Sequence, residues 1–388
     1  MKTILWIYEK ELNPEDGGTE RISDLIMNGL RKRGYNCLGF LEFHHFSNEL
    51  IYHKKKISNL YQFLIENKIN IVINQLGYGD WLLKRFYLDG GTKWLQNGGK
   101  VITCLHFDPK IPPKTWKIIF DNWKIKTPKE KINAIKRYIF SPYYNIQEER
   151  RIRDIYKYLY ENSNLFVMLS QSHYQYFKSL LKLNEYSKLR AIHNPLTFPD
   201  ISSPDIIFQK KKHVLVVARM SEYHKRISFI LKVWKYINSR NKNFDWQLIL
   251  VGDGPDKAKY KEFVNKNKLN NVQFYIQQNP DKFYKESSIF LMSSPSEGWG
   301  LTLTESLQRG VVPIVLNTSP VFSEIIDDGI NGILVNRKSV SYYGEKIMNL
   351  INNDSIRIEM AKNAINKSSI FSLNSILNQW EKILYNIK

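Results

Sequence analysis

Two glutamates eight residues apart flank a glycine-bearing turn in the second half of the chain. The stretch SPSEGWGLTLTE begins just after an apolar strand candidate, and Glu297 and Glu305 lie in it. Gly298 and Gly300 let the backbone approach a ligand, and a helix predicted to start near Leu301 presents free N–H groups, which suits a diphosphate. Each carboxylate would then accept hydrogen bonds from hydroxyls on one side of that diphosphate. A nucleotide sugar, with its sugar on one side and its ribose on the other, has both sets of hydroxyls.

The charge of the chain agrees with an anionic partner but does not identify it. Lys and Arg number 57 against 37 Asp and Glu, which gives a net charge of +20. Such a surface suits nucleic acid, anionic lipid or a phosphorylated substrate, and it also fits a merely solvated basic surface. Aromatic residues make up 13% of the chain, too many for a disordered basic tail. The sequence therefore predicts a folded basic protein.

Length and cysteine content set the broad class. A chain of 388 residues predicts two domains, each long enough for its own core. No apolar run approaches the roughly 20 residues of a membrane span, and the start of the chain does not resemble a signal peptide. Cys37 and Cys104 cannot build a disulfide framework and have no metal-binding spacing. We expect a cytoplasmic protein.

The first half alternates strand and helix patterns. A strand at 2–8 is followed by a loop with Gly17 and Gly18 and then by a helix over 21–34. Further strand candidates lie at 35–43, 70–75, 100–107 and 165–170, with a helix at 57–68 among the segments between them. This alternation indicates a parallel sheet that is covered on both faces.

The same rhythm resumes after a polar, basic break at 203–212. Strand candidates lie at 213–220, 245–252, 271–276, 288–294, 312–316 and 332–335, with helices at 226–240, 255–267, 280–287 and 301–310 between them. The last predicted helix, 372–388, is long enough to cross back to the first half. We predict an α/β protein of two doubly wound domains, 1–197 with 372–388 and 198–371. In such sheets ligands bind beyond the carboxyl ends of the strands.

One segment, 110–153, departs from the pattern. It holds twelve Lys and Arg against four acidic residues, interleaved with aromatic residues that include Trp116, Phe120, Trp123, Tyr138 and Phe140. Bulky aromatics beside lysines suit the headgroup layer of an anionic membrane. A helical excursion with a solvated basic face explains the same composition, and the sequence does not decide between the two.

The glutamate pair and its lead sequence resemble the signature of retaining GT-B glycosyltransferases of family 4. The resemblance covers about 17 to 335, and it implies transfer of a sugar from a nucleotide-diphosphate donor to an acceptor hydroxyl with retained anomeric configuration. It implies that Glu297 contacts the donor sugar and Glu305 the nucleotide ribose. The family's E-A-M-A-x-G continuation matches only at its ends, Glu305 and Gly310. The other donor-binding residues that it implies are Gly298, Trp299, Gly300, Leu301 and Thr302.

Other stretches share this resemblance. VVARMSEYHKR is similar to the family segment whose Arg and Lys neutralise the leaving diphosphate, here Arg219 and Lys225, although the usual Lys-Gly pair has Arg226 in place of glycine. The loop with Gly17 and Gly18 matches the family's glycine loop, whose amides face the diphosphate. His106, at a strand end, matches a histidine that contacts the donor sugar. In LILVGDGP and IHNPL we expect the glycines and the asparagine to shape turns.

The resemblance implies no cofactor and no metal, and no D-x-D, HExxH or C-x-x-C motif occurs in the chain. It leaves the donor's base and sugar open. The basic aromatic segment 110–153 suggests a saccharide or lipid-linked acceptor, as in lipopolysaccharide or capsule assembly at the inner membrane face. Two alternatives remain: a GT-B sugar-nucleotide epimerase, and a basic nucleic-acid-binding protein, for which no module is recognisable. A nicotinamide or flavin oxidoreductase lacks its G-x-G-x-x-G motif.

Overall fold

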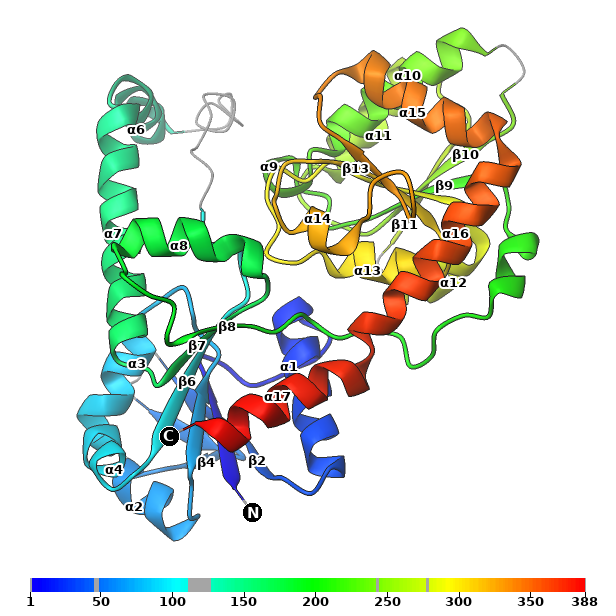
Figure 1. Ribbon diagram of the computed structural model, residues 1–388. Coiled ribbons are helices and arrows are strands. Elements are labelled where there is room, and N and C mark those ends of the chain that lie inside the picture. The colour runs from blue at the N-terminus through cyan, green and yellow to red at the C-terminus, as the bar shows by residue number, and fades with distance from the viewer. Residues whose placement is uncertain (1, 45–48, 111–126, 242–243, 277–278, 388) are drawn as a thin grey trace. The chain divides into compact units, whose positions relative to one another are not determined.

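The computed structural model describes residues 2–44, 49–110, 127–241, 244–276 and 279–387 (Figure 1). The chain divides into two compact units, one of residues 1–192 with 379–388 and one of 193–378. The sequence analysis predicted that the first unit ends at 197 and that the chain returns to it at 372.

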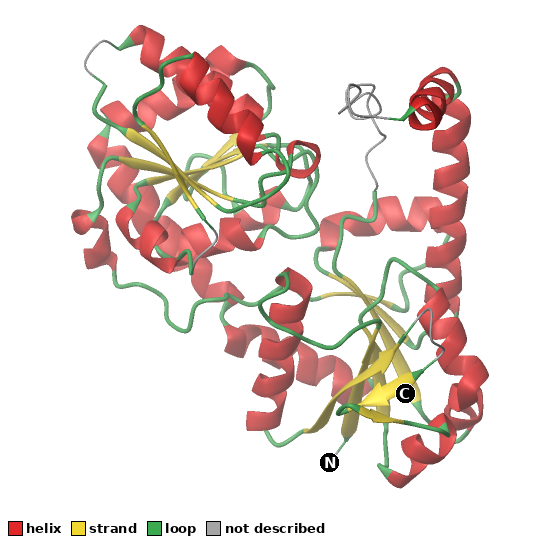
Figure 2. Cartoon of the chain, turned by 180° about the vertical axis from the view of Figure 1, so that it is seen from behind, coloured by secondary structure: helices red, strands yellow, loops and turns green. Residues whose placement is uncertain are grey.

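The first unit is a single sheet with helices on both faces (Figure 2). Its strands are ordered β4-β3-β2-β1-β5-β6-β7-β8. The strands are β1 Thr3–Tyr8, β2 Asn36–Phe43, β3 Leu50–Tyr52, β4 Lys55–Lys56, β5 Ile71–Asn74, β6 Lys100–Leu105, β7 Leu165–Met168 and β8 Leu189–Ala191. The helices are α1 Gly18–Lys32, α2 Leu60–Glu66, α3 Trp81–Phe86, α4 Thr92–Gln96, α6 Pro128–Ile139, α7 Ser141–Glu161 and α8 Tyr174–Leu181, with a π-helical turn at Tyr87–Gly91 and a 3-10 turn at Gln171–His173.

Strand β1 is the point from which this sheet winds in both directions. It pairs in parallel with β2 on one side and with β5 on the other, and all six of its residues are buried. The strand order therefore reverses beside β1, and its carboxyl end is the place where an open α/β sheet accepts a ligand.

An antiparallel hairpin at one edge corrects the prediction of a purely parallel sheet. β3 pairs antiparallel with β2 and with β4. His53 and Lys54, the two residues between β3 and β4, both have positive φ, at 49° and 62°. Two consecutive left-handed residues make the tight turn whose twist matches an antiparallel hairpin, even though no glycine marks it in the sequence.

The second unit has a fully parallel sheet ordered β11-β10-β9-β12-β13-β14. Its strands are β9 His213–Val217, β10 Gln247–Val251, β11 Val272–Tyr275, β12 Ile289–Met292, β13 Val312–Leu316 and β14 Ile333–Val335. The helices are α9 Glu222–Lys225, α10 Ile227–Arg240, α11 Lys257–Lys266, α12 Asp281–Glu286, α13 Leu301–Gln308, α14 Phe322–Ile325, α15 Val340–Asn352, α16 Asp354–Ser368 and α17 Leu373–Asn386, with 3-10 turns at Pro204–Gln209 and Ser369–Phe371. Helix α17 begins in the second unit and ends in the first, whose share starts at Gln379.

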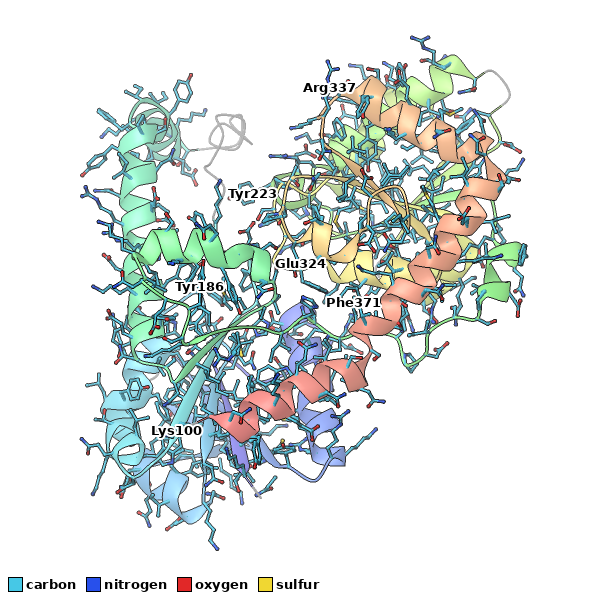
Figure 3. The ribbon with its side chains drawn as sticks, in the orientation of Figure 1. Lys100, Tyr186, Tyr223, Glu324, Arg337 and Phe371 are labelled. Atoms are coloured by element: carbon cyan, nitrogen blue, oxygen red, sulfur yellow. The ribbon has the colours of Figure 1, made fainter. Side chains whose placement is uncertain are left out.

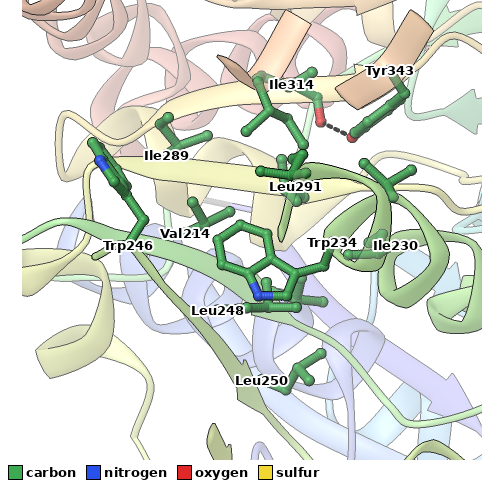
Figure 4. Packing of buried hydrophobic residues seen from close by; sticks show 14 of the residues in the cluster. Val214, Ile230, Trp234, Trp246, Leu248, Leu250, Ile289, Leu291, Ile314 and Tyr343 are labelled. Atoms are coloured by element: carbon green, nitrogen blue, oxygen red, sulfur yellow. Dashed lines mark hydrogen bonds between the residues drawn. The ribbon is translucent and has the colours of Figure 1, made fainter. Parts of the chain in front are cut away.

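The core of the second unit lies between its sheet and the helices α10 and α15 (Figure 4). Trp234 of α10 is fully buried, and its indole N–H donates to Asn271 Oδ1 at 3.1 Å. Tyr343 of α15 is also fully buried, and its hydroxyl donates to the carbonyl of Ile314 at 2.5 Å. Both aromatic side chains bury a large area while their polar atoms keep a partner, which makes a rigid base for the loops at the strand ends.

Part of the unusual segment 110–153 forms the helices α6 and α7, whereas 111–126, with Trp116, Phe120 and Trp123, lies outside the described residues. Helix α6 starts with a capping box in which Thr127 and Glu130 bond to each other's backbone N–H. Figure 1 shows α6 at the end of α7 that lies away from the sheet. No helix among the described residues has the length and apolar character that would let it cross a membrane.

Candidate functional site

The strand order of the second unit reverses beside β9. This strand pairs with β10 on one side and β12 on the other, so the segments that follow β9 and β12 leave the sheet at the same edge. Arg219 and Lys225 follow β9, and Glu297 follows β12. The fold thus brings to one edge residues that are separated by more than 70 positions in the sequence.

Lys225 and Glu297 form an ion pair. The Lys225 Nζ atom lies 2.5 Å from Glu297 Oε1, and the two side chains are 25% and 14% exposed. The backbone around the pair is tied down as well, because Ser293 donates its hydroxyl to the carbonyl of Lys225 and Ser319 donates to the carbonyl of Glu297. The cation predicted for the diphosphate and the carboxylate predicted for the sugar are therefore adjacent.

His224 shows that positive charge is concentrated here. Burial lowers the pKa of its imidazole, and the neighbouring cations Arg219 and Lys225 lower it further, while Glu297 acts in the opposite sense. The ring Nδ1 is 2.9 Å from the hydroxyl of Ser221. Arg219 itself is exposed, and its guanidinium makes no ion pair or hydrogen bond with the described residues. It is thus free to bind an anion.

The backbone after Lys225 explains the family's preference for glycine at the next position. Arg226 has φ of +48° and lies between α9 and α10 in the left-handed region. A non-glycine residue there costs roughly 1–2 kcal/mol. Arg226 therefore adopts the conformation that the resembling Lys-Gly pair would supply, which supports the alignment of Lys225.

The glycines of the 248–255 stretch shape a loop, as expected. Gly252 and Gly254 have φ of +140° and +155°, and a Cβ atom on them would lie 2.1 Å from the Ala218 carbonyl oxygen and 2.6 Å from the Met220 carbonyl oxygen. The loop after β10 thus packs directly on the backbone on both sides of Arg219. It fixes where that residue leaves the sheet.

The glycine turn ends where α13 begins. Gly300 has φ of +99°, and the carbonyl of Gly300 accepts from the amides of Leu303 and Thr304. The amides of Leu301 and Thr302 have no such backbone partner within the described chain, so they remain available to an anion. A small pocket at the ends of β9 and β12 is lined by Lys225, Ser294 and Thr302 among others.

Glu305 is buried one turn into this helix. It is 2% exposed, its Oε1 accepts from the Thr197 hydroxyl at 2.7 Å, and its Oε2 accepts from the Tyr284 hydroxyl at 3.0 Å. The ribose contact implied for Glu305 remains a prediction. Thr197 and Tyr284 carried no signal in the sequence, because only the fold brings them to this carboxylate.

Trp299 is packed inside the second unit. Its side chain is 2% exposed and stacks on the His193 ring, with centroids 4.5 Å apart and planes at 22°. The donor contact implied for Trp299 would therefore involve its backbone rather than its ring, and donor binding by Trp299 and by the partly exposed Gly298 remains a prediction. No motif had singled out His193.

In the first unit, Gly17 and Gly18 lie at the start of α1. Gly17 caps the helix in an extended conformation, and Gly18 is its first residue. Glu20 in the first turn is 7% exposed and pairs with Lys10, whose Nζ lies 2.9 Å from Glu20 Oε1. Tyr8, at the end of β1, contacts the same carboxylate, and its burial and the charge of Glu20 raise the pKa of its phenol to about 12. The first turn of α1 thus contains a carboxylate of the protein itself, that of Glu20.

His106 follows β6 and contacts the side-chain oxygen of Gln75, which follows the adjacent strand β5. Because that oxygen accepts, Nε2 carries the proton. The buried Nδ1 has no hydrogen-bond partner among the described residues. Burial lowers the pKa of His106 to about 4, so the ring is neutral at neutral pH and Nδ1 can accept a hydrogen bond from a hydroxyl. Gln75 could have been suspected, since it is a polar residue directly after a buried strand.

The described residues contain no cluster of three or more His, Cys, Asp and Glu side chains that could hold a metal ion. Cys37 and Cys104 are free and buried.

Comparisons with known proteins point to glycosyltransferases. Residues 198–367 match the family of glycosyl transferases group 1. A Haemophilus influenzae protein named as an uncharacterized glycosyltransferase is 26% identical over 374 residues, which cover 95% of this chain and 96% of that one. A Campylobacter jejuni alpha-1,4-N-acetyl-D-galactosaminyltransferase named for a GalNAc-alpha-(1->4)-GalNAc-alpha-(1->3)-diNAcBac-PP-undecaprenol saccharide is 24% identical over 222 residues, 57% of this chain and 60% of its own.

The fold has solved counterparts. The crystal structure of Anabaena HepE in complex with UDP and glucose matches with a TM-score of 0.68, at 14% identity and over 100% of both chains. The structural neighbours are GT-B glycosyltransferases, so the two α/β units described above have the GT-B fold. The second unit thus matches the glycosyl transferases group 1 over residues 198–367, and the chain has the fold of GT-B glycosyltransferases.

Proposed function

We propose that the protein is a retaining glycosyltransferase that moves a sugar from a nucleoside-diphosphate sugar to an acceptor hydroxyl. The observation that carries the proposal is the group at the edge of the second sheet: Arg219, the Lys225–Glu297 pair and the start of α13. Among the described residues the Arg219 guanidinium has no hydrogen-bond or ion-pair partner, the Lys225 ammonium lies 2.5 Å from a carboxylate, and two amides are open; this set suits a diphosphate that is linked to a hydroxyl-bearing ring.

The chemistry follows from these charges. In the transition state the bond from the anomeric carbon to the diphosphate oxygen breaks, and negative charge builds on the diphosphate while the sugar becomes oxocarbenium-like. Arg219 and Lys225 stabilise that charge in place, and they supply the positive charge that a metal ion brings elsewhere. The acceptor oxygen attacks from the face that the diphosphate leaves, and its proton passes to the departing phosphate oxygen. This front-face course gives retention of configuration.

Nucleotide binding tests the proposal directly. Among UDP, GDP, ADP, dTDP and CMP and their sugars, at least one is expected to bind the wild type more tightly than about 1 mM, or about −4 kcal/mol. Glu305→Gln is expected to weaken that binding because it removes the carboxylate charge at the ribose position. Thermal shift and calorimetry measure both. Glu305→Ala should do the same but also leaves the Thr197 and Tyr284 hydroxyls without an acceptor, so its melting temperature must be compared.

The outcomes separate the candidate functions. If none of these nucleotides binds, the proposal is wrong, and a salt-sensitive shift on DNA would then favour nucleic-acid binding. Release of an altered nucleotide sugar in the absence of any acceptor would identify an epimerase instead. Transfer to an added acceptor with retained configuration is the expected result.

We infer a saccharide or lipid-linked acceptor of surface polysaccharide assembly, used at the cytoplasmic face of the membrane. The Campylobacter relative, whose name includes an undecaprenol diphosphate, supports this class. The helices α6 and α7 support a membrane contact, because they expose a run of apolar side chains: Ile132, Ile135, Tyr138, Ile139, Phe140, Tyr143, Tyr144 and Ile146. Lys129, Lys131 and Lys136 on α6 add positive charge beside them, as anionic headgroups require.

Vesicle flotation checks the membrane contact. The wild type is expected to float with anionic vesicles at low salt and to remain in the soluble fraction with neutral vesicles. Ile135→Ser with Ile139→Ser should reduce flotation, since both side chains are exposed and leave the core unchanged. Ile356→Ser, at an exposed position on α16, is the matched control. No binding of the wild type at low salt would remove the membrane from the proposal.

A further inference from the structure

The first residues of the second unit contact helix α13, whose start is the expected diphosphate site. The unit begins at His193, and residues 193–202 contact the side chains of α13, of the turn before it and of Arg309 after it, in part through their own backbone. The contacts are His193 with Trp299, Thr197 with Glu305, Phe198 and Asp200 with Gln308, and Asp200 and Ser202 with Arg309. The segment that connects the two units is therefore attached to the element predicted to hold the diphosphate.

His193 holds the glycine turn from one side. Its ring stacks on Trp299, its Nε2 lies 3.0 Å from Glu324 Oε2, and Phe371 packs edge-on against both rings. Figure 3 labels Glu324 and Phe371 among the drawn side chains. Because a carboxylate only accepts, the Nε2 atom donates to Glu324, which fixes the rotation of the imidazole. The fixed imidazole in turn holds the Trp299 side chain that stacks on it, and with it the glycine turn.

Thr197 holds Glu305 in the same way. Its hydroxyl donates to Oε1 while Tyr284 donates to Oε2, so both carboxylate oxygens are oriented by the protein before any ligand arrives. The Tyr284 hydroxyl is also 3.0 Å from the carbonyl of Thr302 in the first turn of α13. The carboxylate is buried, and a hydrogen bond to a charged group in such a place is among the stronger ones.

We propose that the connecting segment 193–200 is a positioning element of the donor site, in which His193 fixes the glycine turn through Trp299 and Thr197 aims the Glu305 carboxylate. The inference rests on the proposed function and names the residues that position the donor-binding groups. Its consequence is that any movement of the chain at this crossing changes the affinity for the nucleotide. His193 and Thr197 act through Trp299 and Glu305 and need no contact with the donor.

Variants at the two positions separate positioning from folding. Thr197→Val removes the hydroxyl at nearly constant shape and is expected to raise the Kd for UDP, or for whichever nucleoside diphosphate binds the wild type best, about tenfold. Thr197→Ser keeps the hydroxyl and should restore wild-type affinity. His193→Gln keeps a donor for Glu324 but loses the stack, and it should raise the donor KM several-fold while the acceptor KM stays unchanged.

Ser202→Ala is the matched control, because Ser202 lies just beyond this segment and is buried, and within the described part of the chain its hydroxyl bonds only to Arg309, which follows α13. Its nucleotide affinity should equal that of the wild type. The proposal is overturned if Thr197→Val and His193→Gln bind the nucleotide as the wild type does, or if their losses match that of Ser202→Ala and follow melting temperature alone. A wild type that binds no nucleotide would instead refute the proposed function.

Discussion

Arg219→Ala is expected to lower kcat and kcat/KM together by about two orders of magnitude, or about 2.7 kcal/mol of transition-state stabilisation. The side chain is exposed at the end of β9 and has no ion-pair partner among the described residues, so its charge is available to the departing diphosphate. At about 4 Å and an effective dielectric near 20, such a contact gives about 4 kcal/mol, and solvent around an exposed guanidinium reduces this figure. Steady-state kinetics with the donor identified by the binding screen measures the effect.

Two variants show whether the loss belongs to Arg219 and to its chemistry. Arg240→Ala removes an equally basic side chain at the end of α10, where it lies over the Tyr236 ring, and should leave turnover unchanged. Arg219→Lys keeps the charge but not the two-pronged geometry, and it should recover part of the activity. Unchanged turnover of Arg219→Ala would contradict a role in leaving-group stabilisation.

The effects of substituting Lys225 and Glu297 on kcat are expected to be non-additive. Lys225→Met and Glu297→Gln should each lower kcat by about two orders of magnitude, and the double variant should lose little more than either alone. The reason is the ion pair: with its two atoms 2.5 Å apart, removing one partner also displaces the other from the place where it meets the substrate. A double-mutant cycle on kcat measures the coupling.

The control cycle uses Lys212 and Asp245, an ion pair of the same 2.5 Å separation whose side chains are both 62% exposed. An exposed pair of this kind contributes little. Lys212→Met, Asp245→Asn and the double variant should therefore all keep the wild-type kcat, and the cycle should show no coupling. If Lys225→Met and Glu297→Gln multiply to about four orders of magnitude in the double variant, the two residues act independently and the pair has no joint role.

Local patterns were sufficient for most elements of the fold. The apolar runs of β1 and β9 and the helical period of α10 depend on neighbours in the chain, so each strand or helix formed where its pattern predicted it. The β3–β4 hairpin was not predicted, because its turn places His53 and Lys54 at positive φ without a glycine. The helices α15 and α16 likewise carry no motif. The prediction of a GT-B glycosyltransferase is confirmed by the family match and the fold.

For the candidate site, the sequence predicted the position of the loops but not the partners of the side chains. Because all strands of a parallel sheet have their carboxyl ends at one edge, the sequence suffices to place Arg219 and the glycine turn at that edge. Which side chains point outward depends on packing. Trp299 was expected to bind the donor, and its side chain is buried and stacked on the His193 ring. Glu305 was expected to accept hydrogen bonds from the ribose, and Thr197 and Tyr284 donate to its two oxygens.

The sequence alone thus determined the two-unit α/β architecture and the glycine turn before α13, because these follow from periodicity and from backbone freedom within a few residues. The diphosphate expected at this turn stays a prediction. Only the tertiary structure decided which partners the key side chains take. The pairing of Lys225 with Glu297 spans 72 positions and that of Thr197 with Glu305 spans 108. Contacts over such separations form only when the sheet brings distant loops to one edge, and no local pattern encodes them.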